Sequence, residues 1–184
     1  MSWVAARNLN IVALLGLSGV LAVAFTYQLA LGELPCPLCL LQRMAFVAAG
    51  LGVALNIAVG PRPAHYGMII ISAALGMALS GRQILLHIVP GTGAFGSPLF
   101  GLHFYSWAFV AFAIMVAAAG VMLLMERQFE PQDGRERLRG AAAVAVYLFL
   151  AIALGNALST FAECELGLCP DDPTAYQLFE RWRG

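Results

Sequence analysis

Long apolar runs without a charged side chain dominate the chain. The hydrocarbon core of a bilayer is ~30 Å thick, and about 20 mostly apolar helical residues cross it. Four of the charge-free segments fit one membrane-spanning helix each. The longest segment exceeds one helix, and its Gly- and Pro-rich part between Pro90 and Gly101 predicts a loop followed by a helix. The five segments without Asp, Glu, Lys or Arg are 8–32, 44–61, 63–81, 83–125 and 140–162.

This pattern predicts an all-α integral membrane helix bundle in which a single domain, 1–184, holds all spans. Strands of a membrane barrel would give short alternating segments instead of runs such as 111–124. The 25 charge-free residues of 8–32 exceed the apolar stretch of a usual signal peptide, so we expect this helix to be retained. The expected spans are 9–30, 40–60, 66–86, 103–125 and 140–161, followed by a tail at 162–184.

The composition agrees with a membrane protein and excludes other classes. Hydrophobic residues make up 61% of the chain and charged residues 11%, whereas a soluble globular protein has about 25% charged residues. The formal net charge is +0, so the chain has no excess of basic residues for nucleic acid. We therefore expect the lipid bilayer, and no nucleic acid, as a partner.

The arginine positions predict the orientation of the bundle. The short connection 126–139 holds four of them, Arg127, Arg135, Arg137 and Arg139. Short connections rich in Arg and Lys stay in the cytoplasm. Five spans then place the N-terminus inside and the C-terminus outside. The expected location is the inner membrane of a bacterium, with multiple passes.

All four cysteines then lie on the outer, periplasmic side. Cys36 and Cys39 precede the second span, and Cys164 and Cys169 follow the fifth. The periplasm is oxidising, so disulfides persist there. A Cys164–Cys169 bond would enclose only four residues and add little stability, which favours a redox-active pair. Two purely structural disulfides are the alternative.

The C-x-x-C motif of the first pair has three ordinary meanings: a redox centre, a zinc site or haem attachment. Leu40 stands where haem attachment needs His, and a zinc site would need Cys164 and Cys169 as its remaining ligands. A redox pair is the favoured interpretation, and no metal site is predicted. The motif lies in the run Leu34-Pro35-Cys36-Pro37-Leu38-Cys39-Leu40-Leu41-Gln42-Arg43.

The residues around this motif support redox chemistry. Pro37 fits the first position of a helix, and the free N–H groups at a helix start favour a thiolate. Arg43 lies one helical turn after Cys39. An Arg near a helix end is commonly an interfacial anchor, but Arg43 falls at the outer end of its span, against the positive-inside trend. We therefore expect Arg43 to take part in the chemistry.

The run Pro35-Cys36-Pro37-Leu38-Cys39, followed by Gln42-Arg43, resembles the signature of the DsbB-type disulfide-bond formation proteins. Gly81-Arg82-Gln83 and Pro90-Gly91 are similar to the end of that family's third span, and the resemblance covers roughly 9–125. It implies a four-helix core and a thiol oxidoreductase. A periplasmic thioredoxin-like protein of the DsbA type would deliver two electrons, which pass through two cysteine pairs to a membrane quinone, either ubiquinone or menaquinone.

The resemblance also implies roles for single residues. Cys39 would face the quinone, Arg43 would hold and polarise it, and Cys36 would exchange with the second pair. Gln42, in the same motif, is a further candidate for the quinone site. A guanidinium near the quinone stabilises the negative charge that develops on its oxygen.

Other candidates rest on the chemistry of their own side chains. His87 and His103 could border a quinone headgroup, since His donates hydrogen bonds and protons, but interfacial anchoring is an equal reading for each. Arg82 could join Arg43 or pair with Glu33. Aromatic residues are expected at the outer interface, and two asparagines are expected to serve helix packing. The aromatic residues are Phe104, Tyr105, Trp107, Tyr176, Phe179 and Trp182, and the two asparagines are Asn56 and Asn156.

The chain departs from the family pattern in two ways. The family usually has four spans and carries its second cysteine pair in the loop between the third and fourth. Here the loop 87–102 has no cysteine, a fifth span is added, and the second pair lies in the tail. The contact with the partner is therefore inferred for Cys164 and Cys169 from their side of the membrane and the cysteine count.

Three alternative functions remain open at this stage. A vitamin-K-epoxide-reductase-like enzyme shares the bundle and the chemistry, but its C-x-x-C lies late in the bundle. A protein that carries electrons outward would need a cysteine reachable from the cytoplasm. A non-enzymatic membrane scaffold with structural disulfides is the third alternative.

Overall fold

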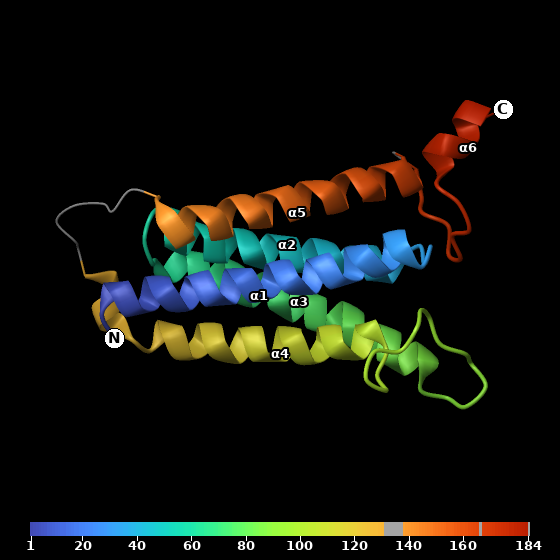
Figure 1. Cartoon of the computed structure of the whole chain (residues 1–184). Helices are drawn as coiled ribbons and strands as arrows, with labels where there is room; N and C mark the ends of the chain where they lie inside the picture. The colour runs from blue at the N-terminus through green and yellow to red at the C-terminus, as the bar shows by residue number, and fades with distance from the viewer. Residues whose placement is uncertain (131–137, 166, 184) are drawn as a thin grey trace.

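The computed structural model describes residues 1–130, 138–165 and 167–183, and it is all-α (Figure 1). Arg135 and Arg137, which helped to predict the orientation, lie outside the described residues. The elements are α1 (Trp3–Ala30), α2 (Pro37–Ala58), α3 (Pro63–His87), α4 (Phe104–Leu123), a 3-10 turn η1 (Glu126–Phe129), α5 (Gly140–Cys164) and α6 (Gln177–Arg183).

Five helices, α1 to α5, are long and apolar enough to cross a membrane. The expected all-α fold is confirmed, and each expected span coincides with a helix that is long and apolar enough to cross a membrane. Helices α1, α2 and α3 begin a few residues before the predicted spans, α4 begins one residue after its predicted start, and α5 begins at the predicted residue. In α2 and α3 the reason is a proline at the first helical position, Pro37 and Pro63, where the missing N–H costs nothing.

Helix α1 shows the largest difference, because it starts at Trp3 instead of residue 9. The Ser2 hydroxyl caps it by accepting a hydrogen bond from the Ala5 N–H at 3.3 Å. Arg7 then lies inside the helix, with its guanidinium carbon 5.4 Å from the centre of the Trp3 ring. A charged residue that finds such a partner need not end the helix.

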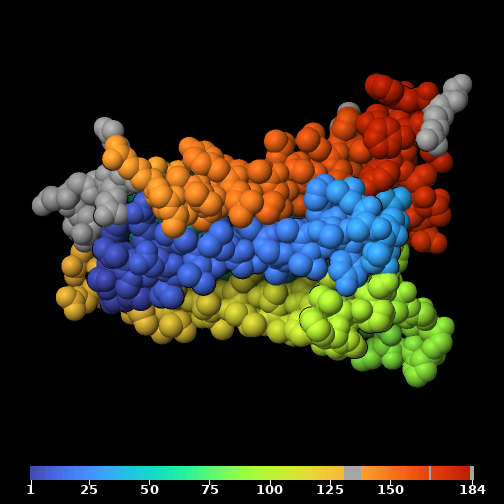
Figure 2. Space-filling model, viewed as in Figure 1, coloured from blue at the N-terminus to red at the C-terminus, as the bar shows by residue number. Residues whose placement is uncertain are grey.

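The helices form one bundle. Helix α3 lies between α2 and α4, while α1 packs against α2 and α5, and α5 also contacts α2. Figure 2 shows α1 running between α5 and α4 on the visible face. The end at which α1 and α5 finish and α2 begins also holds the loop 88–103 (Figure 1). We call it the cysteine end.

Glycines let the helices approach closely. A Cβ atom added at Gly50 would lie on the ring of Phe149 from α5, and one at Gly76 would lie on the ring of Phe112 from α4. Within a bilayer the hydrophobic effect does not drive helices together, so small residues that allow close van der Waals packing stabilise their contacts. The ring of Phe112 also stacks on Phe46, with centroids 3.9 Å apart.

The end opposite the cysteine end is held by a buried hydrogen-bond network. Asn10 donates to the Tyr66 hydroxyl at 3.0 Å, and that hydroxyl donates to Gln128 at 2.9 Å. Asn56 donates to Asn10 at 3.1 Å, and its own oxygen lies 3.0 Å from Nδ1 of His65. Asn56 thus joins helices, as expected for a packing residue.

Candidate functional site

The first cysteine pair lies at the start of α2. Cys36 and Cys39 form a disulfide with Cα atoms 5.0 Å apart. Cys36 is the N-cap of the helix, and its sulfur accepts a hydrogen bond from the Cys39 N–H at 3.2 Å. Pro37 fills the first helical position. The sulfurs therefore lie where the free N–H groups of a helix start favour negative charge.

A buried glutamine of α3 donates to both sulfurs of this disulfide. The Nε2 atom of Gln83 is 3.3 Å from Cys36 Sγ and 3.5 Å from Cys39 Sγ. Gln42 fixes the amide by donating to Gln83 Oε1 at 2.7 Å. Gln83 entered the sequence analysis only within a resembling tripeptide, since the sequence does not show that the last turns of α3 reach the start of α2.

The Arg43 side chain is held between helices by hydrogen bonds. Its Nη1 donates to Gln28 Oε1 at 2.6 Å and lies 3.4 Å from Asn156 Oδ1. Its Nη2 donates to the Ala24 carbonyl at 3.0 Å. The guanidinium is thus held by α1 and α5 from its own position on α2.

Gln28 connects Arg43 with the C-terminal part of the chain. Its Nε2 donates to Ser159 Oγ at 2.7 Å and to the Tyr176 hydroxyl at 3.1 Å. Gln28 is buried, and the sequence does not indicate its role, because a lone Gln within an apolar run carries no signal of its partner. Asn156 was expected only to pack helices and Tyr176 only to line the interface, yet both contact this group.

A cavity of about 450 Å³ opens beside Cys39, Gln42 and Arg43. Its walls come from α1, α2, α4 and the loop that precedes α4, and they are almost wholly apolar. Aromatic rings form much of the lining. They are Tyr27, Phe46, Phe95, Phe104, Tyr105 and Trp107.

The loop before α4 forms part of this wall because it is tied down at two places. Ser97 donates to the Glu33 carboxylate from its backbone N–H at 3.1 Å and from its hydroxyl. Trp107 donates from its indole N–H to the Leu99 carbonyl at 2.9 Å. Leu99 and Leu102 exchange backbone hydrogen bonds of 2.8 and 3.2 Å around a tight turn. Phe104, Tyr105 and Trp107, which were expected at an interface, therefore also line the cavity.

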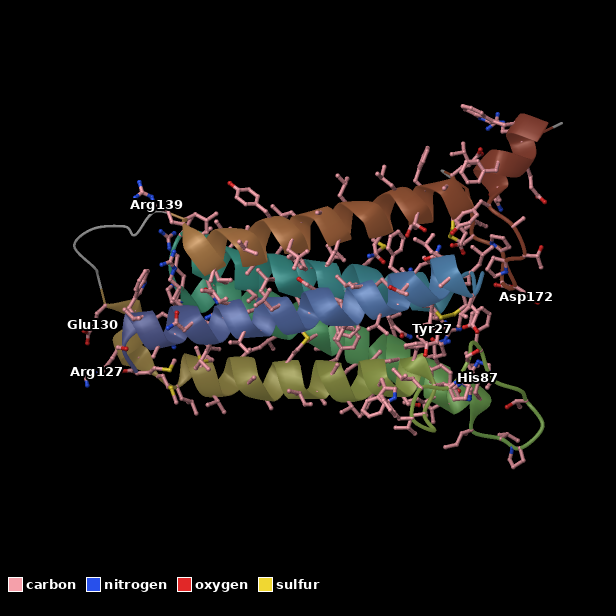
Figure 3. All side chains as sticks on the ribbon, viewed as in Figure 1. Tyr27, His87, Arg127, Glu130, Arg139 and Asp172 are labelled. Carbon is pink, nitrogen blue, oxygen red and sulfur yellow. A yellow bond between two sulfur atoms is a disulfide. The ribbon has the colours of Figure 1, made fainter. Side chains whose placement is uncertain are left out.

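Three residues predicted for the quinone site, Arg82, His87 and His103, lie outside this lining. Arg82 is exposed and does not line the cavity, and Glu33, its possible partner, bonds to Ser97 instead. The ring of His87 stacks on Tyr105 with centroids 5.5 Å apart, so it stands behind a residue of the wall. Figure 3 shows His87 and Tyr27 at the same end of the bundle.

The second cysteine pair lies at the C-terminal end of α5 and just after it. Cys164 and Cys169 form a disulfide with Cα atoms 4.7 Å apart. Cys164 is buried, whereas Cys169 is half-buried and the preceding Leu168 is 95% exposed. The last turn of α5 lies at the cysteine end, as does the first turn of α2 (Figure 1). The structure thus contains two cysteine pairs, each a disulfide, at one end of the bundle.

Comparisons with known proteins agree with the chemistry of the first pair. The family model for disulfide bond formation protein DsbB matches residues 6–95. Disulfide bond formation protein B of Marinobacter nauticus is 46% identical over 77 residues, which cover 40% of this chain and 46% of that protein. The protein of the same name from Xanthomonas euvesicatoria is 41% identical over 81 residues, covering 41% and 47%.

The matched part contains α1 to α3, with Cys36, Cys39, Gln42, Arg43 and Gln83, and it excludes the second cysteine pair. The chain spans about half the length of the curated relatives it matches. No solved structure matches it. Through residues 6–95 the chain belongs to the DsbB family of disulfide bond formation proteins.

Proposed function

We propose that this multi-pass membrane protein is a protein-dithiol oxidase that passes electrons to a membrane quinone. It reoxidises a periplasmic thioredoxin-like protein, similar to DsbA, and the electrons travel through the two cysteine pairs. One observation carries the proposal: an apolar, aromatic-walled cavity has Cys39 and Arg43 in its wall, beside the Cys36–Cys39 disulfide of a DsbB-family chain.

The proposed orientation places the cysteine end in the periplasm. Figure 3 shows Arg127, Glu130 and Arg139 at one end of the bundle and Asp172 at the other. The arginine-rich end is proposed to be cytoplasmic by the positive-inside rule. Both disulfides then face the compartment in which disulfides persist.

The residues around the cavity fit a quinone. A flat ring with two carbonyl oxygens needs apolar walls and a few polar donors, which is the usual make-up of a cofactor site. A guanidinium has five N–H donors, and the described bonds of Arg43 to Gln28, Asn156 and Ala24 leave some of them for an oxygen. When bound, the quinone supplies a two-electron, two-proton acceptor. Arg43 and Gln42 are proposed to hold its oxygens.

The chain's own cysteines perform the thiol exchange. A partner thiolate attacks the Cys164–Cys169 disulfide, and the second partner thiol resolves the mixed disulfide, so the tail pair becomes a dithiol. One tail thiolate then attacks Cys36 and breaks the Cys36–Cys39 bond. The other tail thiol restores the tail disulfide and leaves Cys36 and Cys39 reduced. When the Cys36–Cys39 bond forms again, two electrons and two protons are released, and a quinone held by Arg43 and Gln42 would accept them.

Gln83 and the start of α2 assist the opening of the Cys36–Cys39 bond. The sulfur that leaves is a thiolate, and Gln83 already donates a hydrogen bond toward it, at 3.5 Å from Cys39. Cys39 faces the cavity, so this thiolate forms beside the quinone site. Arg82 and His87 remain predictions for this site, without a contact to the cavity.

A stoichiometric assay tests the proposed function. The protein is purified in detergent with a short-chain ubiquinone or menaquinone, and a reduced thioredoxin-like protein is added. We expect one quinone to be reduced for each disulfide made, and no turnover after Cys36→Ala or Cys39→Ala. Absence of quinone reduction, or full activity in either variant, would overturn the proposal.

Alkylation trapping during turnover separates the enzyme from a membrane scaffold. In the proposed oxidase all four cysteines become transiently accessible to the alkylating reagent after the reduced partner is added. Two structural disulfides would stay closed under the same conditions.

A further inference from the structure

One face of α5 is turned toward Arg43 and Gln28. Asn156, Ser159 and Glu163 are three and four residues apart in sequence, which places them on the same side of a helix. Asn156 lies against Arg43, and Ser159 accepts a hydrogen bond from Gln28. Glu163 continues this face by one more turn toward the cysteine end.

Glu163 is the most deeply buried acid of the described residues. Its exposed fraction is 0%, and neither carboxylate oxygen has a hydrogen-bond partner in the described part of the chain. No direct ion pair joins it to Arg43 in the described part of the chain, but the two opposite charges are close enough to interact electrostatically. A carboxylate in an apolar bundle is costly unless an opposite charge compensates it, so Glu163 and Arg43 depend on each other.

This electrostatic interaction adds to the hydrogen bonds that hold the Arg43 guanidinium. An Arg one turn inside a membrane helix ordinarily extends to the interface. Here Gln28 and the Ala24 carbonyl hold one side of the guanidinium, and the polar face of α5 supplies the negative charge. The cavity side stays open, since Arg43 remains part of the cavity wall.

We propose that Glu163 is a positioning residue: as the buried counter-ion of Arg43, it fixes the guanidinium at the quinone cavity. Helix α5, which lies outside the family match, thereby completes the quinone site. This inference rests on the proposed quinone-dependent function and adds a residue to it. Glu163 does not line the cavity, so it acts through Arg43.

Quinone binding gives a test that is separate from turnover. Trp107 lines the cavity, so a short-chain ubiquinone should quench its fluorescence, and Trp107→Phe assigns the signal. In the oxidised full-length protein, Glu163→Gln is expected to raise the quinone Kd by about ten- to a hundredfold, the effect of losing a partner of a charged group.

Glu165→Gln is the matched control. Glu165 is an acid two residues after Glu163. Both acids flank Cys164 of the second disulfide, but the Glu165 carboxylate pairs with exposed Arg181 at 3.1 Å. We expect its quinone Kd to equal that of the unmodified protein. Equal Kd values for Glu163→Gln and Glu165→Gln would overturn the inference.

A double-mutant cycle decides whether Glu163 acts through Arg43. If it does, Glu163→Gln raises the quinone Kd strongly in the unmodified protein and adds little in an Arg43→Gln background. Additive effects would contradict a positioning role. Glu163→Asp, which keeps the charge, is expected to restore most of the affinity. It also serves as the test variant if Glu163→Gln fails to fold.

The two proposals fail in distinguishable ways. If the unmodified protein neither binds nor reduces the quinone, the proposed function is wrong and the inference falls with it. If the unmodified protein binds and reduces the quinone while Glu163→Gln does so with unchanged Kd, only the role of Glu163 is wrong.

Discussion

At the scale of single residues, the site depends on amide and guanidinium groups that hold one another in place. Gln42 orients Gln83, Gln83 donates to the sulfurs, and Gln28 holds Arg43. Each of these side chains is at least partly removed from solvent, so each bond forms in surroundings of low polarity. Hydrogen bonds to charged groups are strong there, and the loss of one partner leaves the other unsatisfied.

Gln83→Leu is expected to slow the opening of the Cys36–Cys39 disulfide by about tenfold, because a leaving thiolate loses its side-chain donor. The measurement is the rate at which dithiothreitol reduces this pair in the Cys164→Ala, Cys169→Ala background. Ser80→Ala, one turn earlier on α3 and bonded only to backbone carbonyls, is the control. An unchanged rate in Gln83→Leu would show that the amide is only structural.

At the scale of helices, close packing brings α5 onto the four-helix part of the bundle. Gly50 of α2 lies directly beneath the Phe149 ring of α5. The same contact sets how far α5 stands from α2. It therefore also determines whether Asn156 and Glu163 reach Arg43.

Gly50→Ala is expected to lower the stability of the purified protein by about 1–3 kcal/mol, the usual cost of overpacking. Thermal unfolding followed by circular dichroism in detergent measures it. Gly67→Ala, where an added Cβ meets nothing within 4 Å, should leave the stability unchanged or slightly raised. Phe149→Leu should recover part of the loss in the Gly50→Ala protein, and a failure to do so would place the strain elsewhere.

At the scale of the whole molecule, both cysteine pairs lie at one end of the bundle, as the proposed relay of electrons from the tail pair to Cys36 and Cys39 requires. The route in the proposed oxidase enters at the tail pair and leaves at Cys39. Removing the tail disulfide should therefore leave electron transfer from Cys36 and Cys39 to the quinone intact.

Cys164→Ala is expected to abolish quinone reduction by a reduced thioredoxin-like protein while sparing reduction by a small thiol that reaches Cys36–Cys39 directly. Quinone absorbance measures both reactions in the same preparation. Equal rates with the protein dithiol before and after the substitution would make the tail pair structural.

The orientation is tested in intact cells with a thiol reagent that does not cross the membrane. In a background without the native cysteines, Asp172→Cys is expected to react from outside and Glu130→Cys only after the cells are opened. Figure 3 shows these two positions at opposite ends of the bundle. The reverse labelling pattern would invert the proposed topology.

The sequence predicted the five spans well because their signal is local. Charge-free length and proline or glycine at the boundaries decide where an apolar helix can start and end. It also predicted Cys36, Cys39, Gln42 and Arg43 as one group, since four residues of a helix separate Cys39 from Arg43. For α1 the charge of Arg7 misled the boundary, because its contact with Trp3 is not visible in a charge pattern.

The sequence by itself determined the all-α class of the protein, its five long apolar helices, its cysteine motif and its resemblance to a family. These depend on composition and on spacings within one helix. Only the tertiary structure decided which polar residues meet. Gln28, Gln83 and Asn156 lie on three different helices, α1, α3 and α5, and each forms a hydrogen bond with the α2 segment that carries Cys39 and Arg43. Contacts between helices that are distant in sequence depend on packing geometry, which no local sequence pattern specifies.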